Sequence, residues 1–418
     1  MKCRHCGSDL TLPFLDLGSA PPSNAYLSEA ALRAPEAWFP LRLLVCGSCW
    51  LVQTEDHAGR EALFTGDYAY FSSFSTSWLA HAERYVRDMA ARFGLGAGSL
   101  VAEVAANDGY LLQYVRQAGI PCYGIEPTAG TAAAARAKGI EIVERFFGVD
   151  LAGELAAAGR AADLIAANNV LAHVPDIGDF VAGFARLLKP QGVATFEFPH
   201  LMRMVEETQF DTAYHEHYSY LSLLAVARIF KANGLTIFDV EELPTHGGSL
   251  RLFAQRSDSG RHAVNPAVAA LRAREIAAGM DRPGFYRGFQ AATERVKDDL
   301  LVFLIEAKRQ GMKIGAYGAA AKGNTLLNFA GVRPDLLPYV VDRNPAKQGK
   351  FMPGSRIPIV AEDQLKADRP DFVLILPWNL RDEVTTQLAY IGEWGGRFVT
   401  AVPRLAVTVA VIEGRGGA

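Results

Sequence analysis

The sequence lacks any hydrophobic run long enough to cross a membrane, which takes about 20 residues in a helix. Residues 405–412, one of the longest such runs, fall far short of that length. The first residues, Met1 to Arg4, also lack the hydrophobic core of a signal peptide. We therefore expect a soluble cytoplasmic protein that does not associate with membranes.

An excess of charge of one sign is missing as well. The chain has 42 Lys and Arg against 45 Asp and Glu, a net charge of −3, and the two signs are mixed along it. Nucleic-acid-binding proteins gather basic residues on one face, so we expect no nucleic-acid partner. The length of 418 residues predicts two to three domains. It does not determine the oligomeric state, for which a monomer is the simplest expectation.

Cysteine is scarce, but its arrangement is informative. Four of the five cysteines form two CxxC pairs, and Cys122 stands alone. The reducing cytosol disfavours disulfides, and two CxxC turns supply the four thiolates of a tetrahedral zinc site. A redox-active CxxC is the alternative. Because four thiolates leave no open coordination position, the expected Zn²⁺ is structural, with Cys3, Cys6, Cys46 and Cys49 as ligands.

The order of predicted strands and helices divides the chain into three parts. Residues 1–75 contain the cysteines and many turn residues. Residues 76–235 alternate helices with strands near 100–104, 122–125, 140–143, 163–167 and 192–198, which predicts a parallel, doubly wound sheet. Residues 236–418 contain a second α/β unit that starts near residue 312. In such sheets ligands bind beyond the carboxyl ends of the strands.

The loop after the first of these strands resembles the S-adenosyl-L-methionine (SAM) loop of class I methyltransferases, (E/D)-x-G-x-G-x-G. Glu103 and Gly109 match this motif, whereas Ala105 and Asn107 replace two glycines. A carboxylate at the end of the second strand, here Glu126, accepts the ribose hydroxyls in such folds. NAD is the rival ligand, and the missing glycines count against it. The predicted cofactor-binding residues are Glu103, Ala105, Asn107, Asp108, Gly109, Glu126, Pro127, Asn168 and Asn169.

Residues 214–222, Y-H-E-H-Y-S-Y-L-S, concentrate two imidazoles, a carboxylate and three phenols. Side chains of these types transfer protons and stabilise oxyanions. A polar loop and a His-x-His metal pair are the alternatives. Two other segments are candidates for the same site: an aromatic segment at 66–75, which is otherwise interpreted as a core strand, and N-V-L-A-H-V-P around His173, which otherwise lies at a helix start.

The C-terminal part carries two further polar turns. H-G-G-S-L-R at 246–251 lies between two strand-like runs, and Lys322 opens a helix after the strand at 312–317. Helix N-termini bind anions, and a lysine adds positive charge, so we expect a binding site for phosphate or diphosphate here. Asp342 could hold a ribose or base; NAD is again the rival ligand. The predicted substrate-binding residues are His246, Gly247, Gly248, Arg251, Tyr317, Gly318, Lys322, Asn324, Asp342, Trp378 and Asn379.

Taken in order along the chain, these motifs are similar to those of SAM-dependent C-methyltransferases of nucleotide-activated deoxy-ketosugars, which make branched-chain sugars. The resemblance rests on CxxC…CxxC, E-V-A-A-N-D-G, N-V-L-A-H-V-P, Y-H-E-H-Y-S-Y-L-S, P-T-H-G-G-S and Y-G-A-A-A-K-G, and it covers nearly the whole chain. It implies an α/β protein with a class I methyltransferase Rossmann-like domain. An N-terminal zinc module with four cysteine ligands and a C-terminal Rossmann-like α/β domain for the sugar nucleotide would flank that domain.

The resemblance also implies roles for particular residues. Family members methylate C3 of a nucleotide-diphosphate 4-keto sugar, and related enzymes act at C5. The histidine that ends Y-x-E-H, here His217, would be the general base. The other residues implied in the sugar site are Tyr214, Glu216, His173 and a tyrosine of the aromatic segment, Tyr68 or Tyr70.

Elementary chemistry agrees with a histidine in that role. A ketone acidifies the hydrogen on the neighbouring carbon, and removing that hydrogen leaves an enolate. A neutral imidazole, with an ordinary pKa of about 6.5, is a better base at neutral pH than the Glu216 carboxylate at about 4.3. Three alternatives stay open: O- or N-methylation of a sugar nucleotide, and a non-catalytic sugar-nucleotide-binding protein with a degenerate SAM loop. The sequence does not identify the nucleotide base, the sugar or the stereochemical outcome.

Overall fold

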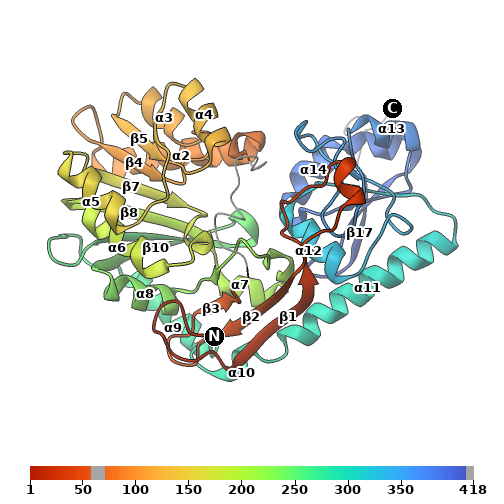
Figure 1. Ribbon diagram of the computed structural model, residues 1–418, viewed down its shortest axis with the longest axis horizontal. Helices are drawn as coiled ribbons and strands as arrows, with labels where there is room; N and C mark the ends of the chain where they lie inside the picture. Colours follow the sequence, from red (N-terminus) through yellow and green to blue (C-terminus); the bar gives the residue numbers. More distant parts are fainter. Residues whose placement is uncertain (58–70, 411–418) are drawn as a thin grey trace, which may run out of the picture.

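Three β-sheets organise the computed structural model, which describes residues 1–57 and 71–410. Two α/β lobes stand side by side, and the N-terminal strands run along the base between them (Figure 1). The predicted arrangement of a central α/β domain with a module before it and a second α/β domain after it is confirmed.

The central sheet has seven strands in the order β10-β11-β8-β7-β4-β5-β6. The strand β4 is buried along its whole length, as expected for a strand covered by helices on both faces. Five neighbouring strands are parallel: β4 (Val101–Val104), β5 (Cys122–Ile125), β6 (Glu141–Val143), β7 (Ala162–Asn168) and β8 (Leu188–Pro199). The antiparallel strands β11 (Ser249–Arg256) and β10 (Leu235–Leu243) complete the sheet.

The sheet therefore extends to Arg256, past the domain boundary that the sequence suggested at residue 235. The alternation of helix and strand marks only parallel units, and an antiparallel hairpin such as β10–β11 does not produce it. The division at residue 235 separates this hairpin from the sheet to which it belongs.

Amphipathic helices pack on both faces of the central sheet. In α6 the buried residues Phe180, Val181, Phe184 and Leu187 follow helical spacing, and the Phe184 ring lies 4.6 Å from that of Phe196 on β8. The helices are α2 (Thr76–Phe93), α3 (Leu112–Gln117), α4 (Ala129–Ala137), α5 (Val149–Ala157), α6 (Ile177–Leu187), α7 (Leu201–Glu206) and α8 (Leu223–Ala232). Short 3₁₀ segments are η2 (Ser72–Phe74), η3 (Leu171–His173), η4 (Phe210–Thr212) and η5 (Thr245–Gly247).

The C-terminal lobe is built on a six-stranded sheet in the order β14-β13-β12-β15-β16-β17. Its strands β12 (Ile314–Tyr317), β13 (Val340–Val341), β14 (Ile359–Val360), β15 (Phe372–Ile375) and β16 (Arg397–Thr400) are parallel, and β17 (Ala406–Val409) is antiparallel. The helices of this lobe are α11 (Phe289–Arg309), α12 (Ala321–Phe329), α13 (Asp363–Asp368) and α14 (Arg381–Gln387), with 3₁₀ segments η6 (Trp378–Leu380) and η7 (Ala389–Trp394). The helix α9 (Pro266–Ala277) instead packs on β10 and α8 of the central domain, and the short helix α10 (Pro283–Tyr286) follows it at the base of the molecule.

The N-terminal module (residues 1–57) forms an antiparallel sheet together with a strand from the central part of the chain. Its strands are β1 (Leu12–Ala20), β2 (Phe39–Val45) and β3 (Val52–Thr54), and η1 (Ala30–Arg33) lies between β1 and β2. The fourth strand, β9 (Ser219–Tyr220), pairs with β3 and belongs to the run 214–222. This pairing joins the module directly to the segment in which the sequence predicts catalytic residues.

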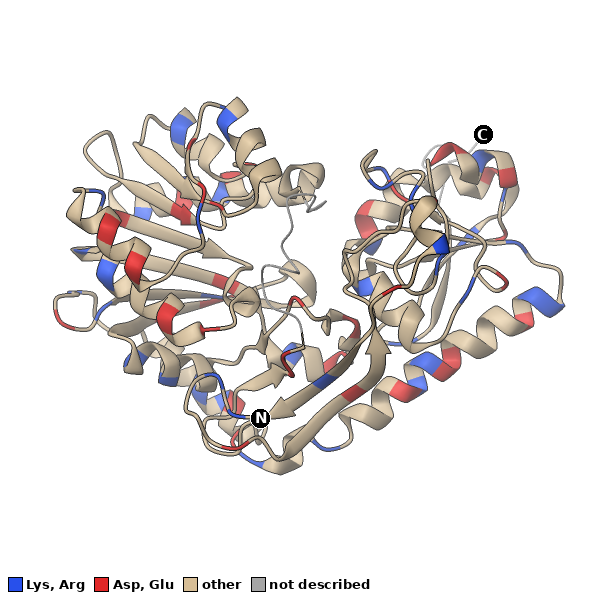
Figure 2. Ribbon diagram, in the orientation of Figure 1, with Lys and Arg blue, Asp and Glu red and all other residues tan. Residues whose placement is uncertain are grey.

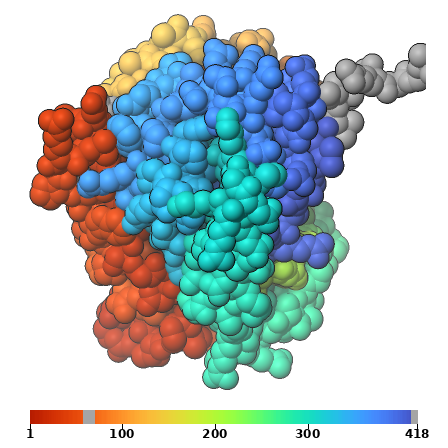
Figure 3. Space-filling view, turned by 90° about the vertical axis from the view of Figure 1, so that its right-hand side faces the viewer, coloured from red at the N-terminus to blue at the C-terminus, as the bar shows by residue number. Residues whose placement is uncertain are grey.

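The N-terminal module also contacts the C-terminal lobe. Leu27 forms a β-bridge with Phe351, and the Gly354 N–H donates to Glu36 Oε1 at 2.6 Å. The Phe14 ring stacks on that of Phe289 with centroids 4.7 Å apart. Figure 3 shows the N-terminal residues, in red, along the flank of the C-terminal lobe. The module is thus packed against both lobes.

Acidic and basic residues are interspersed over both lobes and along α11 (Figure 2), as the mixed sequence pattern predicts. Within residues 1–57 and 71–410, no helix combines the length and hydrophobicity that a membrane span requires.

Candidate active site

The loop after β4 keeps the backbone shape of a glycine motif although two glycines are replaced. Ala105, Asn107 and Gly109 have φ values of 60°, 49° and 75°. A left-handed backbone costs a residue other than glycine about 1–2 kcal/mol, and Asn tolerates it better than most. At Gly109 a Cβ atom would lie 2.4 Å from Ile140 Cδ1, so a side chain there would collide with the core.

Glu126 lies buried at the end of β5 and holds this loop in place. Its Oε2 accepts the Asn107 N–H at 2.9 Å, and its Oε1 accepts the Thr128 N–H at 3.0 Å. The Thr128 hydroxyl donates to the same Oε1. A carboxylate has about four acceptor positions. Three are occupied, so about one is left for a ribose hydroxyl.

A pocket opens beyond the carboxyl ends of β4, β5 and β7. Six of the predicted cofactor residues line it: Ala105, Asn107, Glu126, Pro127, Asn168 and Asn169. Glu103, Asp108 and Gly109 are not among its lining residues. Glu103 is buried, which raises its pKa well above the ordinary value, and Asp108 forms an ion pair with Lys138 at 3.4 Å.

The chemistry of this pocket fits SAM. The side-chain oxygens of Asn168 and Asn169 are buried and have no hydrogen-bond partner among the described residues. An unsatisfied buried acceptor costs about 1–3 kcal/mol. A ligand with an ammonium group and ribose hydroxyls would supply the missing donors.

His217 is held in one tautomer by its neighbours. Its Nδ1 lies 2.9 Å from the Thr212 carbonyl oxygen, which can only accept, so Nδ1 carries the proton. Its Nε2 then accepts from the Tyr214 hydroxyl at 2.8 Å. Burial, with the nearby His173 and Lys322, lowers the pKa of His217 well below its usual value. The imidazole is therefore neutral at physiological pH.

His173 connects His217 to the predicted cofactor pocket. It ends η3, just after β7, and lines that pocket. Its ring packs edge-on against that of His217 with centroids 4.5 Å apart. Burial lowers the pKa of His173 to about 4, so this imidazole is neutral as well.

Glu216 receives a contact that the sequence did not suggest. Asn24, from the N-terminal module, donates from Nδ2 to Glu216 Oε2 at 2.6 Å. Burial raises the pKa of Glu216 to about 7. The turn P-P-S-N at residues 21–24 was visible in the sequence, but nothing local linked it to a residue so far along the chain.

The H-G-G turn at 246–248 belongs to the central domain and contacts the C-terminal lobe. His246 has a φ of 54°, and Asn169 Nδ2 donates to its Nε2 at 3.1 Å. Burial and the charge of Lys322 lower the pKa of His246 to about 4. At Gly247 a Cβ would lie 2.4 Å from the Trp378 ring, and at Gly248 it would lie 2.7 Å from Arg203 Cγ.

Three predicted substrate residues of the C-terminal lobe meet this turn. The Lys322 ammonium lies 4.5 Å above the Trp378 ring and 3.1 Å from Asn379 Oδ1. The Trp378 indole N–H donates to Asp211 Oδ2 at 2.7 Å, across the two lobes. Burial raises the pKa of Asp211 to about 6 and lowers that of Lys322.

Other predicted substrate residues are engaged in contacts within the protein. Arg251 is buried in ion pairs with Glu197 at 2.8 Å and Glu241 at 3.3 Å. The Asp342 carboxylate, which was expected to hold a ribose or base, accepts the N–H groups of Ala319 and Asn344, each at 2.8 Å. Tyr317 donates to Gln387 at 3.1 Å, Asn324 donates to the Ser23 carbonyl at 2.5 Å, and Gly318 packs against Pro377.

Tyr68 and Tyr70 lie outside the described residues. The end of the aromatic segment reaches the loop after β4, where the Ser72 N–H donates to Asn107 Oδ1 at 2.9 Å.

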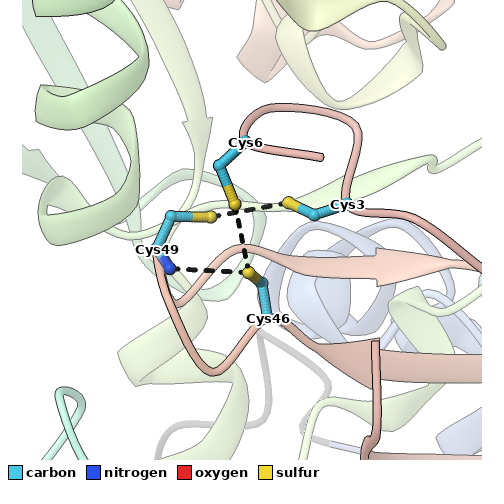
Figure 4. Close-up of side chains that lie close together, drawn as sticks. All are labelled: Cys3, Cys6, Cys46 and Cys49. Carbon is cyan, nitrogen blue, oxygen red and sulfur yellow. Dashed lines mark hydrogen bonds between the residues drawn. The ribbon is translucent and has the colours of Figure 1, made fainter. Parts of the chain in front are cut away.

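The four paired cysteines converge at one edge of the N-terminal module (Figure 4). Their sulfur atoms all lie within 4.8 Å of one another, with Cys3 Sγ 3.5 Å from Cys49 Sγ and Cys6 Sγ 3.4 Å from Cys46 Sγ. Tetrahedral coordination with Zn–S bonds of about 2.3 Å places sulfurs about 3.8 Å apart. The residues therefore fit Zn²⁺.

The replacement Glu126→Gln is expected to weaken SAM binding by about 10- to 100-fold, because charged hydrogen bonds contribute about 1.5–3 kcal/mol and the glutamine amide would face an N–H donor. Titration calorimetry with SAM measures this. Glu141→Gln is the matched control, since that exposed carboxylate on the next strand pairs with Arg160. Equal affinity of the Glu126 variant and the wild type would contradict the assignment.

Comparisons with known proteins identify the domains of the chain. Three family models match: "Putative zinc binding domain" at residues 3–64, "Methyltransferase domain" at 78–240 and "C-methyltransferase C-terminal domain" at 244–403. The C-methyltransferase NovU of Streptomyces niveus is 34% identical over 409 residues, which cover 98% of this chain and 97% of that protein.

Solved methyltransferase structures align with smaller parts of the chain. The magnesium protoporphyrin IX methyltransferase of Synechocystis PCC 6803 is 19% identical, with a TM-score of 0.33, over 43% of this chain and 79% of that chain. The 1,6-didemethyltoxoflavin-N1-methyltransferase of Burkholderia thailandensis is 18% identical, with a TM-score of 0.36, over 50% of this chain and 96% of that chain. Neither similarity is high enough to assign a substrate.

The full-length similarity to NovU and the three matching domains settle the family. This chain belongs to the SAM-dependent C-methyltransferases that carry an N-terminal zinc-binding domain.

Proposed function

We propose that this C-methyltransferase acts at C3 of a nucleotide-diphosphate 4-keto-deoxysugar and produces a branched-chain sugar. One observation carries the proposal: a neutral His217 lies beside His173, which lines the predicted SAM pocket, and its proton-accepting Nε2 is bonded to a phenol. A base next to a methyl donor is what carbon methylation beside a ketone requires.

The reaction begins when the C–H bond beside the ketone breaks. The Tyr214 hydroxyl turns from His217 Nε2 to the carbonyl oxygen of the substrate, the proton passes to the freed lone pair of Nε2, and the electron pair of the C–H bond moves into the carbonyl group to form an enolate. A base in this position accelerates such a step by about 10²–10⁴-fold. The pocket lined by Asn107, Glu126 and Asn168 would hold SAM, which would supply a methyl group on a sulfonium; transfer of that methyl group to the enolate carbon would release the neutral thioether S-adenosylhomocysteine. Alignment of the two reactants supplies much of the remaining acceleration.

Charge that develops on the enolate oxygen needs donors nearby. The Tyr214 hydroxyl and the His173 imidazole both adjoin His217, and the Lys322 ammonium is close enough to lower the pKa of that histidine. Each well-placed donor contributes about 10²–10³-fold. Glu216, held by Asn24, suits contact with a sugar hydroxyl.

The start of α12 has features that suit a diphosphate-binding site. This helix begins without a side-chain cap, so its first N–H groups suit an anion. Lys322 stands in its first turn. Trp378 and Asn379 hold the Lys322 ammonium near the H-G-G turn. A diphosphate bound at α12 would therefore lie on one side of this turn, and the sugar would extend past it toward His217.

Mass spectrometry of products tests the proposal. The enzyme is incubated with SAM and a panel of nucleotide-diphosphate sugars that carry or lack the 4-keto group. We expect only ketosugars to gain a methyl group, and NMR to place that group on C3. A methyl group on oxygen or nitrogen, or equal turnover of sugars without the ketone, would contradict it.

The pH dependence of kcat/KM separates the two central titrating groups. The pKa of His217 is lowered, so this base stays neutral as the pH falls, and its acid limb should lie below about pH 6.5. Glu216, with a pKa of about 7, should add an inflection at neutral pH that disappears in Glu216→Gln. Rate profiles of both proteins measure this, and an acid limb above the ordinary histidine pKa in the Glu216 variant would speak against the base assignment.

A further inference from the structure

Buried hydrogen bonds connect the cysteine cluster (Cys3, Cys6, Cys46 and Cys49) to the run 214–222. The first link is Gln53 on β3, which is completely buried. Its Nε2 donates to Cys3 Sγ at 3.3 Å, and its Oε1 accepts the Arg4 N–H at 2.9 Å. Gln53 therefore fixes the first CxxC turn to β3.

Thr54, the next residue of β3, forms hydrogen bonds to the backbone of two consecutive residues, His217 and Tyr218. Its hydroxyl donates to the His217 carbonyl at 2.5 Å, and its N–H donates to the Tyr218 carbonyl at 3.1 Å. The Thr54 side chain is 1% exposed, so water does not compete for this bond. Thr212 fixes the His217 ring, and Thr54 fixes the His217 backbone.

Arg4, inside the first CxxC turn, reaches both loops that carry the central imidazoles. It donates to the Thr54 carbonyl at 2.9 Å and to the Pro175 carbonyl at 3.3 Å, two residues after His173. Its guanidinium lies 4.8 Å above the Tyr218 ring, next to His217. The side chain is 5% exposed and pairs with Asp56 at 2.6 Å.

A planar guanidinium has five donors in fixed directions, which suits it to set the spacing of several carbonyl groups. Lysine in its place would keep the charge but lose this geometry. The contacts of Arg4 and Thr54 converge on two short segments, and those segments carry His173 and His217.

We propose that Arg4 and Thr54 are positioning residues for methyl transfer, through which the N-terminal zinc-binding domain sets the separation of His217 and His173. The proposal rests on the proposed function of His217. On this proposal the zinc-binding domain contributes to catalysis by positioning the two histidines, in addition to being stable itself. Arg4 and Thr54 do so without contacting the substrate.

Three variants separate positioning from mere stability. Thr54→Val keeps the shape and removes the hydroxyl, Thr54→Ser keeps the hydroxyl, and Arg4→Lys keeps the charge. Lys2→Ala is the control, because Lys2 lies beside the same cluster and its side chain forms an exposed ion pair with Asp9. For each protein we would measure kcat, KM, the SAM dissociation constant, zinc content and the NMR signals of the His217 imidazole.

We expect Thr54→Val and Arg4→Lys to lower kcat by about 10- to 100-fold, since a displacement of about 1 Å at a reacting group has an effect of this size. Zinc content and SAM affinity should not change, the His217 signals should shift, and Thr54→Ser should restore both kcat and the signals. If Thr54→Val does not fold, Arg4→Lys carries the test.

Wild-type kcat together with unshifted His217 signals in Thr54→Val and Arg4→Lys would overturn the proposal. A drop in kcat that Lys2→Ala shares would overturn it too. Failure of the proposed function is a different result: an active His217→Asn variant refutes the base assignment, whereas the NMR signals report the coupling without reference to activity.

Discussion

Replacement of His217 with asparagine is expected to lower kcat by about 10²–10⁴-fold, the contribution of a general base. The asparagine amide can still donate to the Thr212 carbonyl, as the Nδ1 of His217 does, but it has no basic lone pair. SAM affinity should stay at its wild-type value, because His217 is not among the residues that line the predicted cofactor pocket. Steady-state kinetics and titration calorimetry with SAM measure the two quantities.

His215→Asn is the matched control. His215 stands two residues away, but its Nε2 faces the carbonyl groups of Phe39 and Pro40 in the N-terminal module, at 3.3 Å and 3.2 Å. We expect this variant to lose some stability and to keep kcat within a few-fold of the wild type. Equal losses of kcat in the two variants would mean that the run needs its histidines for folding rather than for proton transfer.

Replacement of Cys46 with serine is expected to release the zinc and to unfold the N-terminal sheet. Cys46 is completely buried at the end of β2, and structural zinc sites contribute binding free energies on the order of 10 kcal/mol to folding. Activity should fall with the fold, because β3 pairs with β9 in the run that carries His217. Metal analysis and thermal unfolding measure the two effects.

Cys122→Ser provides the comparison for this prediction. Cys122 begins β5 and lies apart from the other four cysteines. Its replacement should leave zinc content unchanged. A Cys46→Ser protein with one zinc per chain and the wild-type melting temperature would contradict the structural role of the cluster.

That several predicted cofactor residues line one pocket could be predicted from the sequence, because these residues lie at strand ends. Parallel strands bring their carboxyl ends to one edge, so Asn107, Glu126 and Asn168 meet although up to 61 residues separate them in the chain. Although two glycines are replaced, Ala105 and Asn107 adopt the left-handed backbone that the motif requires.

Contacts between distant segments could not be predicted in this way. Asn24 meets Glu216 across 192 residues, and β9 completes a sheet whose other strands end at residue 54. Hydrophobic periodicity and turn signals are local properties, so they carry no information about these pairings. The ion pair of Arg251 with Glu197 and the hydrogen bond from the Ala319 N–H to Asp342 are further contacts between distant segments.

The most direct test of the account is hydrogen exchange at C3 of the 4-ketosugar in deuterated water, with S-adenosylhomocysteine in place of SAM so that no methyl transfer follows. We predict that the wild-type enzyme introduces deuterium at C3 and that His217→Asn does not, because His217 removes that hydrogen. Exchange by His217→Asn at the wild-type rate would show that another group forms the enolate.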